Sequence, residues 1–314
     1  MRALRFYGPG DLRLEDVPRP EPRSGELLLQ VAVALTDATD LKTFRRGHPL
    51  LLEETPSPFG HEVCGVDVST GRRMVAANSA PCGVCPPCRR GQETLCEDRP
   101  FLNGAYAEYV VVPERISSAN ALQVPDTLTS EVAALVEPLA CCLHAVERAD
   151  VRAGDLVAVL GPGPAGLMLC GCVADAGGHP VSVGGRTERR ALPPEFGGQL
   201  GDGRGADIVI EATGTPDGWR DAVALVRPGG TVLFFGGLER GVEVPVDAYR
   251  MHYEELTLRG AFHHAPRHVR AALAFLASGA YPWARLITHR IGLDEVPALF
   301  ADPPRDLLKA AVVP

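Results

Sequence analysis

The chain has 314 residues, of which 46% are hydrophobic and 22% charged, and its formal net charge is −8. This length suits two domains with a sizeable core, and the acidity argues against nucleic acid or an anionic membrane surface as a partner. No apolar stretch reaches the length of a signal peptide or a membrane span before Gly, Pro or charge interrupts it. Nine cysteines without a secretion signal indicate reduced thiols or metal ligands, so we expect a cytoplasmic protein.

The first part of the chain, to about residue 112, has the pattern of a β-rich domain. Short Val-rich runs separated by Gly, Pro and charged turns predict strands at 27–35, 65–70, 72–77 and 106–113. The stretch 130–149 that follows has helical length and composition, and Ser130 is a plausible N-cap.

Two carboxylates, Asp37 and Asp40, follow the strand predicted over 27–35. Asp and Thr commonly end strands in turns, so this stretch alone favours a turn. "PFGHEVCG" places His61 and Glu62 after a glycine, and Glu137 falls within a strongly apolar helix. A buried carboxylate needs a partner, and a metal ion is one candidate.

Four cysteines, Cys82, Cys85, Cys88 and Cys96, have the spacing C-x2-C-x2-C-x7-C on a loop shaped by Gly and Pro. Four thiolates on one loop match a closed tetrahedral zinc site, which leaves no position for a substrate and is therefore structural. A nucleic-acid-binding zinc ribbon is the alternative use, but the acidic chain disfavours it.

The pattern changes after residue 155. Apolar runs at 156–161, 180–185, 206–214 and 230–237 resemble buried parallel strands, and stretches of helical length lie between several of them. This alternation predicts a doubly wound parallel sheet with helices on both faces. From about residue 263 the chain returns to helix at 267–279, and 286–300 follows. We expect three segments, 1–147, 148–262 and 263–314, the last of which rejoins the first.

A glycine-rich loop directly follows the strand predicted at 156–161. Gly161, Gly163 and Gly166 form G-x-G-x-x-G at the start of a helical pattern, a context that predicts dinucleotide binding through the loop residues Gly161, Gly163, Pro164, Ala165 and Gly166.

The second strand of this sheet ends in glycines, where an NAD site would have an acidic residue that binds the ribose. Gly185 with Arg186, Arg189 and Arg190 close behind instead suits a 2′-phosphate, so we expect NADP rather than NAD and take Gly185, Arg186 and Arg190 as cofactor-binding residues. The alternative is a solvated basic start of a helix. Only residues 184–207 separate this strand from the next, and Pro193 and Pro194 would break a helix there. A full helix–strand–helix connection cannot fit in this segment, so we expect the connection to be shortened and this edge of the sheet to be reduced.

Taken together, "TDLK", "GHE", the four-cysteine lobe, "EPLACCLHA", "GPGPAG", "EATG" and "LITH" resemble the medium-chain dehydrogenase/reductase family, in its zinc-dependent alcohol and polyol dehydrogenase branch. The resemblance covers nearly the whole chain. It implies an α/β protein with a GroES-like β-rich catalytic domain, built from both chain ends, and a Rossmann domain between them. It also implies a homodimer or homotetramer and a small alcohol or ketone substrate.

The resemblance also implies roles for individual residues. His61 corresponds to a ligand of a catalytic zinc ion, with Glu62 and Glu137 as ligands or close supports. Thr39 corresponds to a hydroxyl that relays the substrate proton, Asp40 to the residue that orients the ligating histidine, and Lys42 to a later relay position. On the nicotinamide side the corresponding residues are Thr213, Gly214 and Gly236.

One position departs from the family pattern. Where the family has a zinc-ligating cysteine before Gly-Thr-Asp, this chain has Asp37 before Ala-Thr-Asp. A carboxylate can still bind Zn²⁺, and it makes Mn²⁺ or Mg²⁺ more credible competitors. We expect Asp37 to be a metal ligand; the alternative is that the metal site has decayed.

The predicted activity is a reversible, NAD(P)-linked oxidation of an alcohol, of polyol, sugar or amino-alcohol type, to its ketone or aldehyde. Two alternatives remain open at this point. One is a metal-free NADPH reductase on the same fold, and the other is a catalytically silent subunit that binds nucleotide or serves a structural role.

Overall fold

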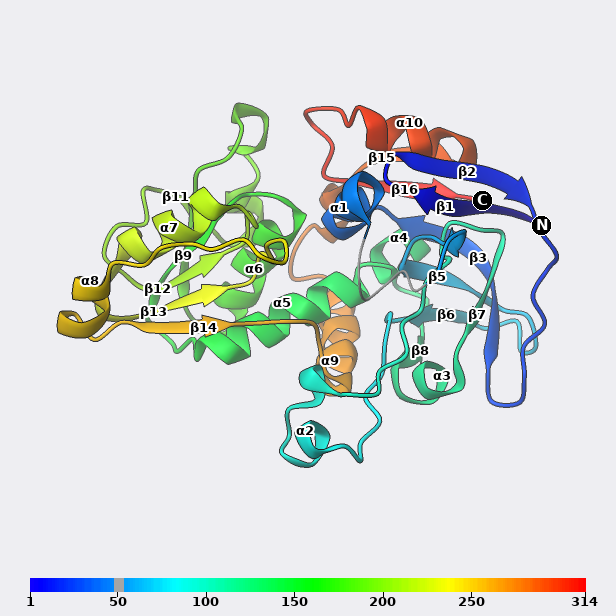
Figure 1. Ribbon diagram of the computed structural model, residues 1–314, viewed down its shortest axis with the longest axis horizontal. Helices are drawn as coiled ribbons and strands as arrows, with labels where there is room; N and C mark the ends of the chain where they lie inside the picture. Colours follow the sequence, from blue (N-terminus) through cyan, green and yellow to red (C-terminus); the bar gives the residue numbers. More distant parts are fainter. Residues whose placement is uncertain (48–53) are drawn as a thin grey trace. The chain divides into compact units, whose positions relative to one another are not determined.

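The computed structural model describes residues 1–47 and 54–314. The chain divides into two compact units, one formed by Met1–Ala140 with His264–Pro314 and the other by Cys141–His263 (Figure 1). The first unit therefore contains both ends of the chain. No helix among the described residues is long and apolar enough to cross a bilayer.

The described residues of the first unit form one large sheet and one small one. The large sheet has the order β15-β16-β3-β5-β6-β8, with β7 also paired to β3. Its strands are β3 (Leu27–Leu35), β5 (Glu62–Asp67), β6 (Arg73–Ala76), β7 (Tyr109–Val112), β8 (Ala121–Gln123), β15 (Ile287–Gly292) and β16 (Lys309–Val313). The small sheet contains β1 (Arg2–Gly8), β2 (Asp11–Asp16) and β4 (Ser57–Pro58).

Strand pairing in the large sheet brings three distant segments together. The C-terminal strand β16 lies antiparallel to β3, with Ala311 opposite Leu35, and β3 lies antiparallel to β5, with Leu35 opposite Glu62. The alternating apolar residues of β3 are buried, as their strand pattern predicts. The end of β3, the start of β5 and the start of β16 therefore lie next to one another at one end of these three adjacent strands.

The helices of the first unit are short. They are α1 (Ala38–Arg46), α2 (Pro86–Arg89), α3 (Glu114–Asn120), α4 (Ser130–Ala133), α9 (Pro266–Ala277) and α10 (Val296–Ala301), while α5 (Val136–Ala149) continues into the second unit.

The single helix predicted over 130–149 is wrong in one respect, because it is divided into α4 and α5. Pro138 explains the break: a proline has no N–H to donate, and it is tolerated in the first turn of α5 but not in a continuous helix. The predicted N-cap is also displaced by one residue, since the Thr129 hydroxyl accepts the Val132 N–H at 3.2 Å.

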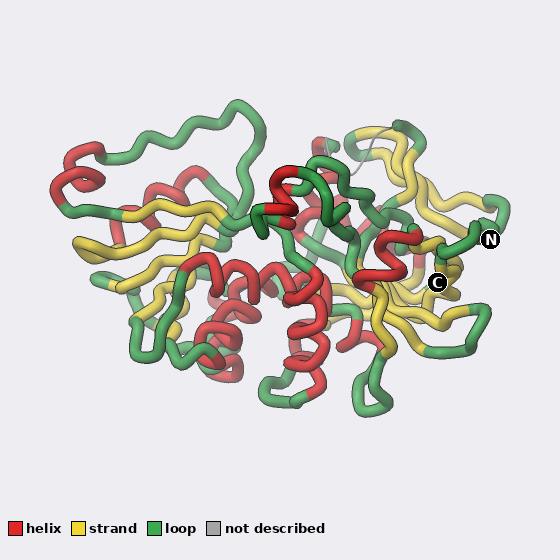
Figure 2. Tube along the Cα trace, turned by 90° about the horizontal axis from the view of Figure 1, so that it is seen from below, coloured by secondary structure: helices red, strands yellow, loops and turns green. Residues whose placement is uncertain are grey.

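The second unit is a parallel sheet with helices on both faces (Figure 2). Its strand order is β11-β10-β9-β12-β13-β14. The elements are β9 (Leu156–Leu160), α6 (Pro164–Asp175), β10 (His179–Val183), β11 (Gln199–Leu200), β12 (Ala206–Glu211), α7 (Pro216–Leu225), β13 (Val226–Phe234), α8 (Ala248–Tyr253) and β14 (Thr257–Gly260). The chain order reverses at β9, which is where sheets of this kind bind ligands.

The connection from β10 to β12 is trimmed, as the sequence predicts. It contains two 3-10 turns (Thr187–Arg189 and Pro193–Phe196) and the two-residue strand β11. In its last part, 201–205, the backbone at Gly203 packs directly on the sheet. A Cβ on Gly203 would come within 2.6 Å of Val183 and 2.8 Å of Ala158. Glycine at this position, with φ of +66°, lets a loop cover the sheet face where there is no helix.

Candidate functional site

The two acids after β3 begin helix α1. Asp37 is its N-cap, and its Oδ2 accepts the Thr39 N–H at 2.9 Å, while Asp40 Oδ2 accepts the Asp37 N–H at 3.1 Å. This reciprocal pair satisfies two N–H groups of the first turn. The stretch therefore begins a helix and is not the simple turn that it favours when taken alone. The second oxygen of each carboxylate is left for other contacts.

The histidine and glutamate of "GHE" enter the same site from β5. Gly60 precedes them with φ of +89°, and a Cβ there would lie 2.8 Å from the ring of Tyr106. Glycine is therefore required for the chain to pass over that ring. Both His61 and Glu62 are buried.

Asp37, His61 and Glu62 converge. Each offers a ligand atom, and the three atoms lie within 4.8 Å of one another. Two carboxylates and an imidazole form a donor set suited to a divalent cation of the zinc, manganese or magnesium class. The residues present therefore fit a metal ion.

His61 is held in one orientation by a chain of hydrogen bonds. Its Nδ1 lies 2.9 Å from Asp40 Oδ1, which leaves Nε2 as the free ligand atom. The hydroxyl of Tyr106, a fully buried residue, donates to Asp40 Oδ2 at 2.5 Å and lies 3.2 Å from Leu35 O. Burial would lower the pKa of His61, but the carboxylates of Asp40, Glu137 and Asp37 together outweigh burial and raise that pKa to about 10. Tyr106 was not predicted as a site residue, since the sequence places it only at the start of a strand predicted over 106–113.

Lys309 is a further residue that the sequence analysis missed. Its Nζ lies 2.6 and 2.8 Å from the two oxygens of Glu62, 3.4 Å from Asp37 Oδ1 and 3.1 Å from Thr36 O. Burial would lower the pKa of Lys309, but the Glu62 and Asp37 carboxylates outweigh burial and raise it, so the residue is an ammonium.

The ammonium of Lys309 stabilises the carboxylate of Asp37. Burial would raise the pKa of Asp37, but Lys309 and His61 reverse this effect and hold the pKa below its usual range. The sequence does contain a signal for the burial of Lys309: it is one of two lysines in the chain, and it begins the apolar C-terminal run.

Glu137 is the fourth predicted ligand, and the structure does not place it in the Asp37–His61–Glu62 cluster. It lies in the first turn of α5, where its Oε1 is 3.7 Å from His264 Nε2. That imidazole nitrogen is also 3.3 Å from Asn78 Oδ1. Glu137 is still close enough for its charge to raise the pKa of His61, after the larger contribution of Asp40.

The two predicted relay residues lie on α1. Thr39 is in its first turn and Lys42 follows three residues later, which places them on neighbouring positions of one helical face. Both are half-buried. Their role in proton transfer stays a prediction.

The four cysteines of the lobe also converge. The sulfurs of Cys82, Cys85, Cys88 and Cys96 lie within 4.8 Å of one another, and none of the nine cysteines forms a disulfide. The Val84 and Cys85 N–H groups point at the Cys82 sulfur and lower its pKa to about 6. Closely spaced sulfurs, one of them easily ionised, fit a tetrahedral zinc ion.

The glycine loop of the second unit is shaped for close approach. A Cβ on Gly166 would lie 1.9 Å from Gly161 O, and a Cβ on Gly185 would lie 2.1 Å from Pro162 Cγ. Gly163 is the N-cap of α6, and Pro164 and Ala165 form its first turn. A glycine loop that leads into a helix N-terminus offers free backbone N–H groups, and these fit the pyrophosphate of a dinucleotide.

The arginines near this loop differ in position. Arg186 and Arg190 are exposed at the two ends of a 3-10 turn. Arg189, between them, is half-buried, and its Nη1 lies 3.7 Å from where a Cβ of Gly163 would stand. Arg189 is therefore the arginine that the structure places against the glycine loop, although Arg186 and Arg190 were the ones selected as site residues.

Beyond the loop, the predicted residues Thr213, Gly214 and Gly236 are organised by Glu211, which was not foreseen. Its buried Oε1 accepts the Thr213 N–H at 2.6 Å and the Gly214 N–H at 2.9 Å. A Cβ on Gly236 would lie 2.7 Å from Glu211 Oε2. The acid that ends the apolar run "DIVIE" thus fixes the turn after β12.

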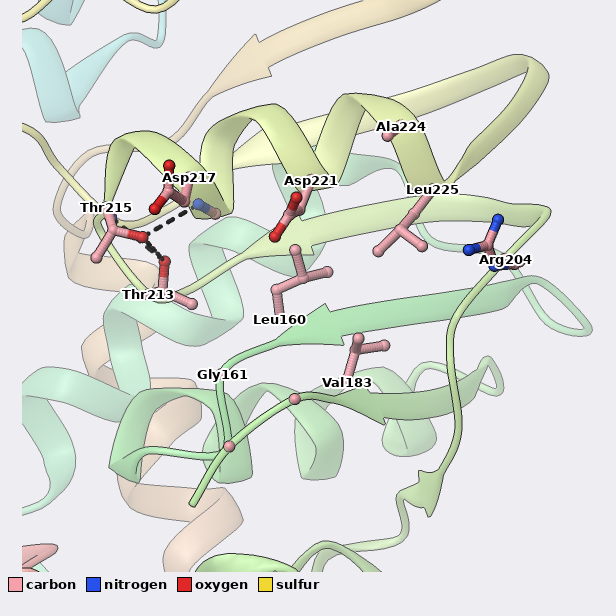
Figure 3. A pocket seen from close by; sticks show the side chains of 13 residues that line it. Leu160, Gly161, Val183, Arg204, Thr213, Thr215, Asp217, Asp221, Ala224 and Leu225 are labelled. Carbon is pink, nitrogen blue, oxygen red and sulfur yellow. Dashed lines mark hydrogen bonds between the residues drawn. The ribbon is translucent and has the colours of Figure 1, made fainter.

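A pocket of about 420 Å³ opens beside these residues, and we call it the α7 pocket. Figure 3 shows it between helix α7 and the strand ends near Leu160 and Val183. Its lining includes the predicted cofactor residues Gly161, Gly185 and Thr213.

The two-unit fold, the Asp37–His61–Glu62 and four-cysteine clusters and the glycine loop are typical of the two-domain dehydrogenases. Comparisons with known proteins indicate the same class. Residues 23–126 match the family model described as alcohol dehydrogenase GroES-like domain, and residues 198–278 match zinc-binding dehydrogenase. An erythritol/L-threitol dehydrogenase of Mycolicibacterium smegmatis is 31% identical over 94% of this chain and 92% of its own length. A sorbitol dehydrogenase of Bacillus subtilis is 27% identical over 94% and 91%.

A solved structure supports the same conclusion. A Sinorhizobium meliloti 1021 protein assigned to the zinc-binding dehydrogenases, in complex with NADP, is 30% identical and has a TM-score of 0.91 over 100% of this chain and 99% of its own. The chain therefore belongs to the zinc-dependent alcohol and polyol dehydrogenase family of medium-chain dehydrogenases, which confirms the resemblance and the GroES-like and Rossmann folds. It is an NAD(P)-linked oxidoreductase.

Lys309→Met should destabilise the protein by about 3–5 kcal/mol, because it leaves the buried Glu62 carboxylate without its counter-ion. Denaturant unfolding measures this. Arg290→Met is the matched control, since it removes an exposed ion pair with Glu131 one strand away and should cost about 1 kcal/mol or less. Equal losses in the two variants would contradict the assigned role of Lys309.

Tyr106→Phe should weaken divalent-metal binding at the Asp37–His61–Glu62 cluster by about 10–100-fold, because Asp40 loses the donor that fixes it against His61. Calorimetric titration of zinc or manganese into the metal-depleted protein measures the affinity. The ring itself remains packed on Gly60, so the fold should survive. Tyr109→Phe, on strand β7, is the control, and unchanged affinity in both variants would exclude a role for the Tyr106 hydroxyl.

Proposed function

We propose that this protein is a metal-dependent, NADP-linked dehydrogenase that interconverts a polyol-type alcohol and its ketone or aldehyde. The observation that carries the proposal is the buried convergence of Asp37, His61 and Glu62, with His61 oriented by Asp40. The names of the similar proteins, an erythritol/L-threitol dehydrogenase and a sorbitol dehydrogenase, support a substrate with several hydroxyls.

Asp37, His61 and Glu62 would hold the catalytic ion, with Glu137 close by. When bound, a divalent ion supplies a Lewis acid that lowers the pKa of the substrate hydroxyl. Asp40 fixes the ring of His61, and Lys309 balances the charge of the buried Glu62. The all-oxygen and nitrogen donor set favours hard cations more than a cysteine-containing set does.

The remaining predicted residues have supporting tasks. Thr39, at the start of α1, would receive the substrate proton and pass it toward Lys42 on the next turn. Cys82, Cys85, Cys88 and Cys96 would hold a structural zinc ion. That ion would fix the lobe around α2 and take no part in the chemistry.

NADP is the proposed cofactor. The glycine loop and the N-terminus of α6 would receive its pyrophosphate, and the arginines at 186, 189 and 190 would pair with its 2′-phosphate. The NADP-bound S. meliloti structure supports this choice. The nicotinamide would lie near Thr213, Gly214 and Gly236, which Glu211 holds in place.

Assembly and location are also part of the proposal. We infer a homodimer or homotetramer, as the family resemblance implies. Nine cysteines without a disulfide support a reducing compartment such as the cytoplasm.

A metal-free reductase on the same fold is the second candidate, and one observation favours it. The ammonium of Lys309 already sits beside Glu62 and Asp37, where it supplies a positive charge without any ion. Metal dependence of turnover distinguishes the two candidates.

Asp37→Asn should lower turnover of alcohol and NADP by about 100-fold or more and reduce bound metal from two ions per chain to one. Asparagine keeps the N-cap hydrogen bond to Thr39 and removes only the charge, so the fold should be retained. Asp247→Asn is the matched control, because Asp247 is the N-cap of α8 in the other unit. Unchanged turnover in Asp37→Asn would remove Asp37 from the mechanism.

A further inference from the structure

The α7 pocket owes its existence to the trimmed connection between β10 and β12. Residues 201–205 cross the sheet as a loop in place of a helix, and the buried Leu160 and the half-buried Val183 form the apolar part of the pocket lining under helix α7. The pocket extends from Gly161, at the end of β9, toward Arg204 (Figure 3), and Gly185 is also part of its lining. Its volume of about 420 Å³ is in the range of small-molecule sites.

The polar side chains that line this pocket are largely committed to other partners. Thr213 and Thr215 bond to each other at 2.9 Å, and the Thr215 hydroxyl also accepts the Gly218 N–H at 3.1 Å. Asp217 is ion-paired with Arg220 on the outside of the helix. Because they already have partners, these side chains shape the wall of the pocket more than they offer hydrogen bonds to a ligand.

Asp221 differs from them. It lies one turn after Asp217 on α7, and Figure 3 shows its carboxylate directed from the helix toward Leu160. Within the described residues no hydrogen bond or ion pair engages it. It is an acceptor-only group placed over an apolar floor, so it favours a flat apolar ring that carries a hydrogen-bond donor.

The two ends of the pocket define the rest of the ligand. The glycine loop at Gly161 would receive the pyrophosphate, as it does in sheets of this kind, and the apolar lining at Leu160 and Val183 would receive the attached base. Among purines, adenine carries an amine at C6, whereas hypoxanthine and guanine carry a carbonyl oxygen there. A carboxylate accepts a hydrogen bond from the amine and repels the carbonyl.

We propose that Asp221 makes the site selective for adenine as the base of the dinucleotide, because its carboxylate accepts a hydrogen bond from the C6 amine of adenine. This inference rests on the proposed dinucleotide function and adds to it a residue that determines base specificity. Asp221 has no part in hydride transfer, so its effect falls on binding and not on the chemical step.

The test compares NADPH with its hypoxanthine analogue, in which a carbonyl replaces the amine. Binding to the full-length protein is followed by nicotinamide fluorescence. The wild-type protein should bind NADPH more tightly by about tenfold or more. In Asp221→Asn that preference should vanish or invert, because the amide N–H can donate to the carbonyl of the analogue. Asp217→Asn removes the same charge one turn away and should keep the preference.

Equal binding of the two dinucleotides by the wild-type protein would overturn the inference and leave the proposed function intact. Loss of the preference in Asp217→Asn, with its retention in Asp221→Asn, would also overturn it. Failure of either dinucleotide to bind would contradict the proposed function itself, and the inference with it.

Discussion

The pairing of Lys309 with Glu62 is the contact on which the candidate metal site depends. Three carboxylates, those of Asp37, Asp40 and Glu62, lie close together where the protein excludes most water. Such charges are tolerated only when they are paired and hydrogen-bonded. Lys309 supplies the opposite charge, and His61 supplies a hydrogen bond to Asp40; the fold brings both in from segments that are remote in sequence but adjacent in the sheet.

This arrangement explains how the site keeps its shape with Asp37 where the family has a cysteine. Asp37 begins α1 as its N-cap and simultaneously presents an oxygen to the cluster. Tyr106 and Asp40 set the ring of His61 independently of what binds its other nitrogen. The harder donor set is therefore built into the same framework of hydrogen bonds, since the Asp37 N–H donates to Asp40 and the Asp37 carboxylate accepts from Thr39.

Much of this could be predicted from the sequence, because the relevant patterns are local. Strand β3 has the predicted bounds of residues 27–35, the glycine loop opens α6, and the four cysteines meet. Lys309, Tyr106 and Glu211 were missed because their roles depend on pairings across the sheet or on a turn whose geometry no pattern encodes. Glu137 was expected among the ligands, but the structure leaves it outside the cluster. The break before α5 follows from Pro138, a residue that the prediction of one helix over 130–149 did not take into account.

X-ray absorption at the zinc edge, on wild-type protein loaded with zinc, tests the central claim most directly. Two kinds of zinc are predicted in equal amounts, one surrounded by four sulfurs and the other by oxygen and nitrogen only. A single zinc per chain with sulfur ligands alone would contradict the account of Asp37, His61 and Glu62.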